Sequence, residues 1–154
     1  MDHDRRQEFE RICGRIIMQK LTTFLLFVGK QHGKDEEAIN FYVSLFRNST
    51  IHKVERYGPN EGEKEGTVKH AEFVFNGQEF MVMESGLDHK VTFTPAMSIF
   101  VTCESEQEID ELFGRLSENG KVHMSLSQYP FREKFAWVDD RFGVSWQLNL
   151  PNNH

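Results

Sequence analysis

Apolar residues recur at helical spacing in two parts of this chain. After Asp35 they stand at Ala38, Phe41, Tyr42 and Leu45, which is the i, i+3, i+4, i+7 pattern of one helix face. A second stripe comprises Ile109, Leu112, Phe113 and Leu116, and every member lies at the same separation in the sequence from its counterpart in the first stripe. The equal spacing predicts two helices in an internally repeated chain.

Strand patterns surround each predicted helix in the same order. Runs rich in β-branched and aromatic residues occupy 20–28, 50–57, 67–75 and 78–84 in the first half, and 97–103, 121–127, 135–138 and 144–150 in the second. Asn76-Gly77, between two of these runs, is typical of a tight hairpin turn. Ser105, followed three residues later by Glu108, predicts a capping box at the start of the second helix.

This order describes two βαβββ modules, at about residues 18–86 and 95–151. Neither module buries its helix stripe and its sheet face alone, so we expect a single domain over residues 18–151. The predicted fold class is α+β, with the two modules forming a curved mixed sheet that carries the helices on its outer face. Residues 1–17 are strongly charged and predict an N-terminal extension, helical or disordered, rather than a secretion signal.

Composition narrows the functional classes. The net charge of −6 disfavours a nucleic-acid partner, because binding to phosphates needs a basic surface. The longest apolar stretch, 24–28, is too short to span a bilayer, so we expect no membrane partner. Cys13 and Cys103 show neither metal-ligand spacing nor a disulfide framework, which favours a cytoplasmic location. Cys103 is predicted to be buried against the helix layer as a small hydrophobic residue.

Two segments resemble a known family. The helix segment Ala38-Ile39-Asn40-Phe41-Tyr42 and the ending Asp140-Arg141-Phe142-Gly143-Val144-Ser145-Trp146-Gln147 occur here in the duplicated order described above. Together they resemble the PhnB-like branch of the vicinal oxygen chelate superfamily over roughly residues 18–151. Its wider relatives include glyoxalase I, bleomycin-resistance and fosfomycin-resistance proteins, and extradiol dioxygenases.

Members of this branch often carry the label of a 3-demethylubiquinone methyltransferase. A methyltransferase needs a site for its methyl donor, and we find no glycine-rich loop between a strand and a helix that would form one. The residues therefore disfavour the methyltransferase label.

The resemblance also identifies where a metal would be expected. In the metal-dependent relatives, His, Gln or Glu side chains hold a divalent ion inside the curved sheet, and the corresponding positions here are Thr23, Met83, Ala96 and Gln147. Three of these residue types are not ligands for such an ion, and one Gln does not hold it alone, so we expect no metal and no other cofactor. If that alignment is shifted, the fallback ligands are His70 and Glu72, which share a strand face, and Glu84 on the paired strand; otherwise these residues form an ion pair at the surface.

Strand alternation predicts which residues line the concave side of the sheet. Trp146 and Leu148 should face the helices, which leaves the opposite face of their strand for a ligand. The predicted lining consists of Thr23, Leu25, Phe27, Met81, Met83, Ser98, Phe100, Ser145, Gln147 and Asn149. This mostly apolar set suits a small apolar or aromatic molecule, which Gln147 would orient by a hydrogen bond. The alternative is that the bulky members simply fill the space as core.

The sequence therefore predicts a PhnB-like protein that binds a small molecule without a metal. The resemblance further implies a homodimer in which each cavity is built from two chains. The alternative function is a metal-dependent lyase, dioxygenase or antibiotic-modifying enzyme of the same superfamily. We assign no catalytic residue, because no nucleophile has a visible activating partner in the sequence.

Overall fold

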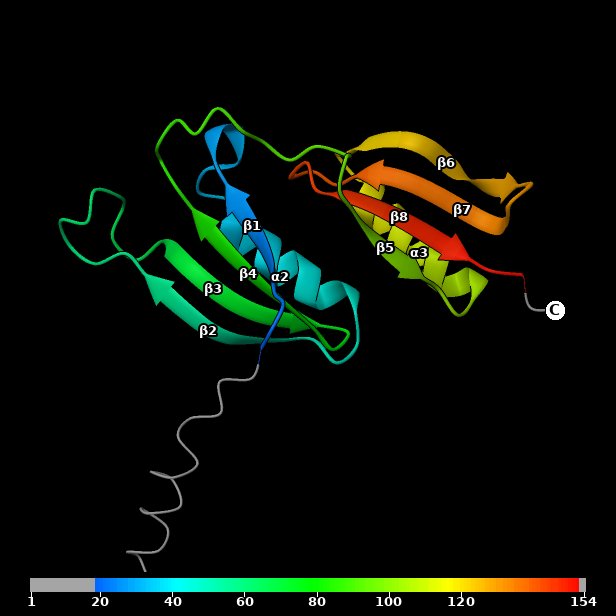
Figure 1. Ribbon diagram of the computed structural model, residues 1–154, viewed down its shortest axis with the longest axis horizontal. Helices are drawn as coiled ribbons and strands as arrows, with labels where there is room; N and C mark the ends of the chain where they lie inside the picture. The colour runs from blue at the N-terminus through cyan, green and yellow to red at the C-terminus, as the bar shows by residue number, and fades with distance from the viewer. Residues whose placement is uncertain (1–18, 153–154) are drawn as a thin grey trace, which may run out of the picture.

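The computed structural model describes residues 19–152, which form two modules (Figure 1). The first contains β1 (Thr23–Phe27), the 3-10 helix η1 (Gly29–Gln31), α2 (Asp35–Leu45), β2 (Thr50–Arg56), β3 (Val68–Phe75) and β4 (Gln78–Glu84). The second contains β5 (Ser98–Thr102), α3 (Glu106–Ser117), β6 (Lys121–Tyr129), β7 (Arg132–Asp139) and β8 (Ser145–Leu150). The predicted α+β class and the two βαβββ modules are confirmed. The predicted N-terminal extension, 1–17, lies outside the described residues.

Each module builds a four-stranded mixed sheet, and the two sheets have equivalent strand orders, β1-β4-β3-β2 and β5-β8-β7-β6. In both, the first strand runs parallel to the last, while the last three strands form an antiparallel meander. Between residues 19 and 152 no strand pairing joins the two sheets, so they do not close into a barrel. In this part of the chain β1 and β5 therefore each keep one edge without a strand partner.

Local sequence accounts for the turns that shape each module. Asn76 and Gly77 adopt φ values of 48° and 79°, the left-handed conformation that the two-residue hairpin between β3 and β4 requires. At the start of α3, the Ser105 side chain accepts a hydrogen bond from the backbone N–H of Glu108, at 3.2 Å. The hairpin and the helix cap therefore form where the sequence predicts them. The first strand begins at Thr23, slightly later than the pattern indicates.

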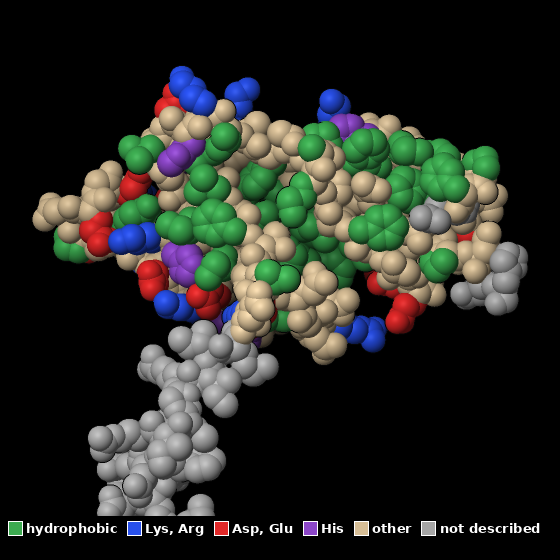
Figure 2. All heavy atoms as spheres, in the orientation of Figure 1, with side chains coloured by type: hydrophobic (Ala, Val, Ile, Leu, Met, Phe, Trp, Pro, Cys, Tyr) green, Lys and Arg blue, Asp and Glu red, His purple; other side chains and the backbone are tan. Residues whose placement is uncertain are grey.

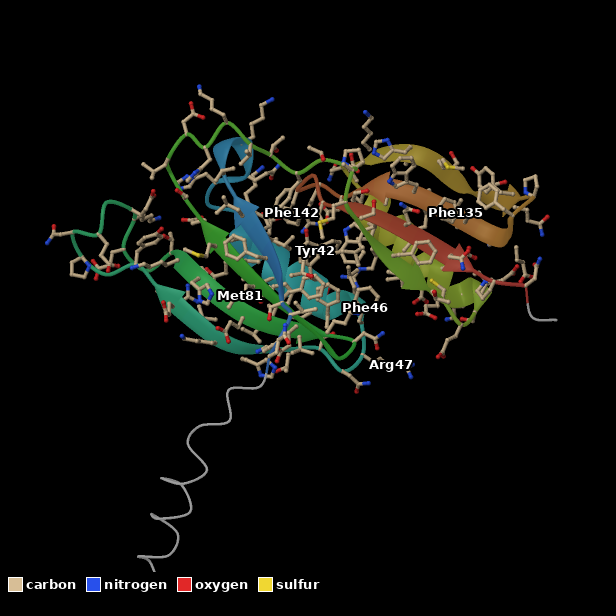
Figure 3. All side chains as sticks on the ribbon, viewed as in Figure 1. Tyr42, Phe46, Arg47, Met81, Phe135 and Phe142 are labelled. Carbon is tan, nitrogen blue, oxygen red and sulfur yellow. The ribbon has the colours of Figure 1, made fainter. Side chains whose placement is uncertain are left out.

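A buried aromatic cluster joins the two modules. Tyr42 of α2 is fully buried, and its ring centroid lies 5.6 Å from that of Trp146 in β8 and 6.0 Å from that of Phe142. Figure 3 shows Tyr42 and Phe142 together at the boundary between the modules. Tyr42 packs on Phe73 of β3 in its own module as well as on Trp146, so side chains from both modules meet in this cluster. Figure 1 shows the two sheets side by side, with α2 and α3 behind them. We call the face of each sheet that carries no helix its outward face.

Asp140 anchors this junction. One of its carboxylate oxygens, Oδ2, accepts hydrogen bonds from the Tyr42 hydroxyl at 2.7 Å and the Trp146 indole N–H at 2.9 Å. The other, Oδ1, accepts from the backbone N–H groups of Phe142 and Val144. Burial raises the pKa of Asp140 above its ordinary value, although the four donors favour the charged form. A single carboxyl group thus connects a helix of the first module to the β7–β8 turn of the second.

Two further predictions concern single features. Cys103 is 2% exposed and belongs to the hydrophobic core, as predicted. Over residues 19–152, no helix has the length and apolar character needed to cross a membrane.

Candidate ligand-binding site

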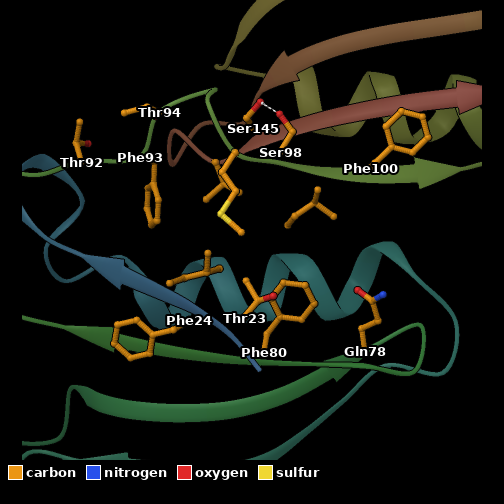
Figure 4. Close-up of a pocket in the computed structure, with 14 residues that line it drawn as sticks. Thr23, Phe24, Gln78, Phe80, Thr92, Phe93, Thr94, Ser98, Phe100 and Ser145 are labelled. Atoms are coloured by element: carbon orange, nitrogen blue, oxygen red, sulfur yellow. Dashed lines mark hydrogen bonds between the residues drawn. The ribbon is translucent and has the colours of Figure 1, made fainter. Parts of the chain in front are cut away.

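A cleft of about 460 Å³ lies between the two modules (Figure 4). Its walls come from β1 and β4 on one side, from β5 and the start of β8 on the other, and from the loop that connects the modules. The lining residues are Thr23, Phe24, Leu25, Gln78, Phe80, Thr92, Phe93, Thr94, Met97, Ser98, Ile99, Phe100, Val144 and Ser145. Its volume falls within the range of small-molecule sites in proteins, about 300–1,000 Å³.

Among residues 19–152, no ionisable side chain lines this cleft. Every lining residue is apolar or carries a hydroxyl or amide group, so the cleft offers no general acid or base and no strong metal ligand. Two of its polar groups are linked to each other. The hydroxyl groups of Ser98 and Ser145 lie 2.7 Å apart, and the indole N–H of Trp137 donates to the Ser145 hydroxyl at 2.9 Å. This arrangement provides hydrogen-bonding partners for a ligand within an otherwise apolar surface.

Apolar side chains also reach solvent around this cleft. Phe24 on β1 and Phe100 on β5 are each 49% exposed, Met97 is 75% exposed, and Leu21 before β1 is 91% exposed. Figure 2 shows hydrophobic side chains gathered across the middle of the face that Figure 1 presents. Exposed phenylalanine and methionine next to two unpaired strand edges are typical of a surface that another chain or a ligand covers.

The structure brings half of the predicted lining together at this cleft. Thr23, Leu25, Ser98, Phe100 and Ser145 line it. The predicted residues that do not line it are Phe27, Met81, Met83, Gln147 and Asn149.

The prediction for β1 is wrong by one residue. It placed Thr23, Leu25 and Phe27 on the same face as Met81 and Met83. In the parallel pairing of β1 with β4, Thr23 lies opposite Phe80 and Phe27 opposite Glu84, so these residues share the helix-bearing face.

The consequence is clearest at Phe27, which is fully buried and packs edge-on against Phe93 and Phe142 as part of the core. Alternation then places Phe24 and Leu26 on the outward face instead. The apolar run Thr23–Phe27 carries no alternation of its own that would have shown this.

The second module follows the predicted alternation. Ser98 pairs with Ser145 and Phe100 with Gln147, so these four residues share the outward face of the sheet. Asn149 lies farther along the same face, opposite Thr102. It is 5% exposed, and its Oδ1 has no hydrogen-bond partner among the described residues.

Sequence reasoning missed the contribution of the connecting loop. Thr92, Phe93, Thr94 and Met97 all line the cleft, yet they belong to a segment without strand or helix periodicity. The available signal was Phe93 itself, because a phenylalanine between polar residues in a loop usually packs against something. Here its ring packs on Phe27 at 5.3 Å.

The residues at the metal positions of the relatives do not fit a metal. Thr23 and Met83 lie on opposite faces of their sheet, since Thr23 registers with Phe80, and Ala96 offers no ligand atom. The fallback set does not converge either: His70 and Glu72 register with Met83 and Met81 on the outward face, whereas Glu84 turns to the helix-bearing face.

On the helix-bearing face, Glu84 accepts a hydrogen bond from the backbone N–H of Gly33, at 2.7 Å. It also lies beside the buried carboxyl group of Asp35. Burial, followed by the negative charge of Glu84, raises the pKa of Asp35 to about 7.

A family model described as 3-demethylubiquinone-9 3-methyltransferase matches residues 19–149. The chain belongs to this family. Among solved structures, the PhnB protein from Bacillus cereus is 55% identical, with a TM-score of 0.80, and the match covers 86% of this chain and 99% of that one. This family thus includes a PhnB protein with the same fold, as the sequence motifs indicate.

More distant relatives support the fold of this family member. Protein PA1353 from Pseudomonas aeruginosa is 23% identical with a TM-score of 0.72, covering 88% of this chain and 100% of that one. A glyoxylase/bleomycin resistance protein/dioxygenase domain from Frankia sp. EAN1pec is 13% identical with a TM-score of 0.57, covering 88% and 94% of the two chains. At these identities the similarity shows a shared fold and no shared activity.

Among curated proteins, Protein YjdN from Escherichia coli (strain K12) is 24% identical over 83 residues. That match covers 54% of this chain and 56% of YjdN. It therefore spans little more than half the length of this curated relative.

Proposed function

We propose that this protein is a cytoplasmic homodimer that binds a small apolar or aromatic molecule in the cleft between its modules, without a metal in that cleft. The observation that carries the proposal is the lining, to which the described part of the chain contributes no ionisable side chain. A site that performs proton transfer or metal catalysis needs titratable or ligating groups at the reacting atoms. A site that only binds needs shape, apolar surface and a few hydrogen-bonding groups.

The aromatic residues of the lining support the proposed ligand class. Phe24, Phe80, Phe93 and Phe100 stand around the cleft (Figure 4), and aromatic rings gain free energy from edge-to-face or offset packing with a flat ligand. The linked hydroxyl groups of Ser98 and Ser145 provide a donor and an acceptor for one polar end of that ligand.

The exposed apolar residues support the homodimer. Phe24 and Phe100 are both half-exposed at strand edges without partners in the described residues. Pairing of β1 from one chain with β5 from the partner would cover both edges and bury both rings. The cleft would then be enclosed by two chains, as the family resemblance implies.

The alternative function, a metal-dependent lyase, dioxygenase or antibiotic-modifying enzyme, requires ligands that the cleft lining does not include. The family description names a methyltransferase, but residues 19–152 form two separate mixed sheets rather than the strand–glycine loop–helix arrangement that commonly binds nucleotide-like cofactors. Neither alternative is favoured by a specific feature of the site.

The proposal is tested with the full chain and with variants of the cleft. Light scattering coupled to size exclusion gives the oligomeric state, and a thermal-shift screen of aromatic compounds, followed by calorimetry, gives binding. We expect a mass of two chains and at least one aromatic ligand. Phe100→Glu should reduce both dimerisation and ligand binding by tenfold or more, whereas Leu87→Glu, which changes an equally apolar residue outside the lining that is 72% exposed, should affect neither.

Separate results address the two parts of the proposal. A monomer that keeps its ligand would refute the homodimer, and Ser145→Ala should then still weaken binding of ligands that carry a polar end. Turnover that depends on an added metal, and that is lost in Gln147→Ala, would refute the binding function in favour of the enzyme alternative.

A further inference from the structure

At the end of the first module, three segments bring a histidine and two glutamates together. His32 follows η1, Glu63 belongs to the loop between β2 and β3, and Glu84 ends β4. One ligand atom from each side chain lies within 4.8 Å of the others. None of the three lines the cleft between the modules.

The geometry at His32 suits an ion better than a hydrogen bond. The His32 side chain is 35% exposed, but its Nε2 atom is buried, at ion-pair distances of 3.1 Å from Glu63 Oε2 and 3.8 Å from Glu84 Oε1, and forms no hydrogen bond within the described residues. Ligand atoms about 2.1 Å from a shared ion, at angles of about 90–110°, stand about 3.0–3.4 Å apart and off the axis of the imidazole nitrogen. The 3.1 Å between His32 Nε2 and Glu63 Oε2 matches this arrangement. Glu84 Oε1, at 3.8 Å from His32 Nε2, needs to move only slightly closer to join it.

The surroundings of these side chains are shaped to hold them. Glu84 is 3% exposed, and its Oε2 accepts the Gly33 N–H, so its Oε1 is the oxygen nearer to His32. Gly86 adds space at the same point: a Cβ there would stand 2.2 Å from Glu63 Oε1 and 3.4 Å from His32 Nε2. An outer hydrogen bond that orients a ligand is typical of metal sites in proteins.

A buried polar atom beside the cluster gives it further support. Asp35 is 1% exposed, lies beside Glu84, and has an Oδ2 without a hydrogen-bond partner in the described part of the chain. The nearby Arg56 is engaged by Glu36, at 2.7 Å. A buried carboxylate oxygen without a partner is unusual, and one beside the cluster marks a polar position that the described residues leave unfilled.

We propose that His32, Glu63 and Glu84 bind one divalent transition-metal ion of the zinc class, which clips the end of β1, the β2–β3 loop and the end of β4 together. One imidazole and two carboxylates are ligands that suit such an ion. The site is distinct from the outward face on which the metal of the relatives is expected, because Glu84 turns away from Met81 and Met83. Its role is structural, and it does not depend on the function proposed for the cleft.

The test uses the full chain, stripped with EDTA and then titrated with Zn²⁺, with Mn²⁺, Ni²⁺ and Ca²⁺ for comparison. Calorimetry should show one Zn²⁺ per chain, and the melting temperature should rise as the site fills. His32→Ala and Glu63→Gln should each weaken binding by at least tenfold. His70→Ala, which removes an outward-facing histidine of β3, should leave it unchanged and serves as the matched control.

Gly86→Ala separates loss of binding from loss of folding, because it keeps every ligand and displaces only the Glu63 carboxylate. We expect this variant to bind Zn²⁺ more weakly. After EDTA treatment of both proteins, its melting temperature should lie within a few degrees of that of the unaltered chain. Absence of stoichiometric binding for every ion would overturn the proposal. So would binding that survives both His32→Ala and Glu63→Gln, or that is lost only in His70→Ala. Ligand binding in the cleft is measured separately, so neither proposal decides the other.

Discussion

The hydrogen bond between Tyr42 and Asp140 offers the sharpest test of how the two modules are held together. Tyr42→Phe removes one hydroxyl oxygen from a fully buried ring and leaves the Asp140 carboxylate with three of its four donors. The ring and its aromatic contacts remain, so no large cavity forms. A buried hydrogen bond to a charged group contributes about 1.5–3 kcal/mol, and we therefore expect the free energy of unfolding to fall by about 2 kcal/mol.

Urea unfolding followed by tryptophan fluorescence measures this loss, because Trp146 is itself part of the junction. For a chain of this length, about 2 kcal/mol corresponds to a fall of about 4–8 °C in melting temperature. The dependence of the unfolding free energy on urea should not change, since the same surface is exposed on unfolding. The loss should also shrink at acid pH, because protonation of Asp140 weakens the bond that the substitution removes.

Tyr129→Phe is the matched control. Its hydroxyl also donates a short hydrogen bond, at 2.8 Å to the Ser125 carbonyl, but this bond is exposed. We expect a loss below about 0.5 kcal/mol, as for surface substitutions in general. If Tyr42→Phe costs no more than this control, the Asp140 network does not stabilise the junction and the reasoning above is wrong.

Two further predictions concern the second module. Burial raises the pKa of Cys103 to about 12, from an ordinary value of 9.0, so peptide mapping should find its thiol unlabelled by iodoacetamide at pH 8 until the chain unfolds. The unfolded thiol ionises above about pH 9 while the native one does not. The unfolding free energy should therefore fall with rising pH between about 9 and 12, by up to about 1.4 kcal/mol per pH unit relative to Cys103→Ala, and parallel curves for the two proteins would argue against a raised pKa. Ser105→Ala removes the cap of α3, and thermal or urea unfolding should show a loss of about 1 kcal/mol, with little change in Glu118→Ala at the other end of the helix.

The elements that the sequence predicted correctly are those with strong local signals. The apolar stripes of α2 and α3 are present, and the Asn76-Gly77 hairpin and the Ser105 cap form where their residue types indicate. The outward face of β8 followed from the alternation around Trp146. Each of these signals lies within a short stretch of chain, where the period of the helix or strand fixes which side chains share a face.

The candidate sites needed more than local pattern. The cleft combines two strand edges with a connecting loop, and the predicted lining therefore included Phe27 but omitted Phe93. The His32 cluster gave no sequence signal, because its three members stand far apart in the chain, in loops or at a strand end. The sequence grouped Glu84 with His70 and Glu72 as fallback ligands, but in the structure those two residues lie on the opposite face of the sheet.

By itself, the sequence determined that the chain would form two βαβββ modules, because the two helix stripes and their flanking strands repeat at one spacing and neither module can bury its apolar faces alone. Only the tertiary structure decided which face of β1 is buried, since Thr23–Phe27 is apolar almost throughout and its register depends on parallel pairing with β4 across an intervening helix and hairpin. The tertiary structure also brought Tyr42 to Asp140 from distant parts of the sequence, because such contacts depend on how whole elements pack and not on the spacing of residues along the chain.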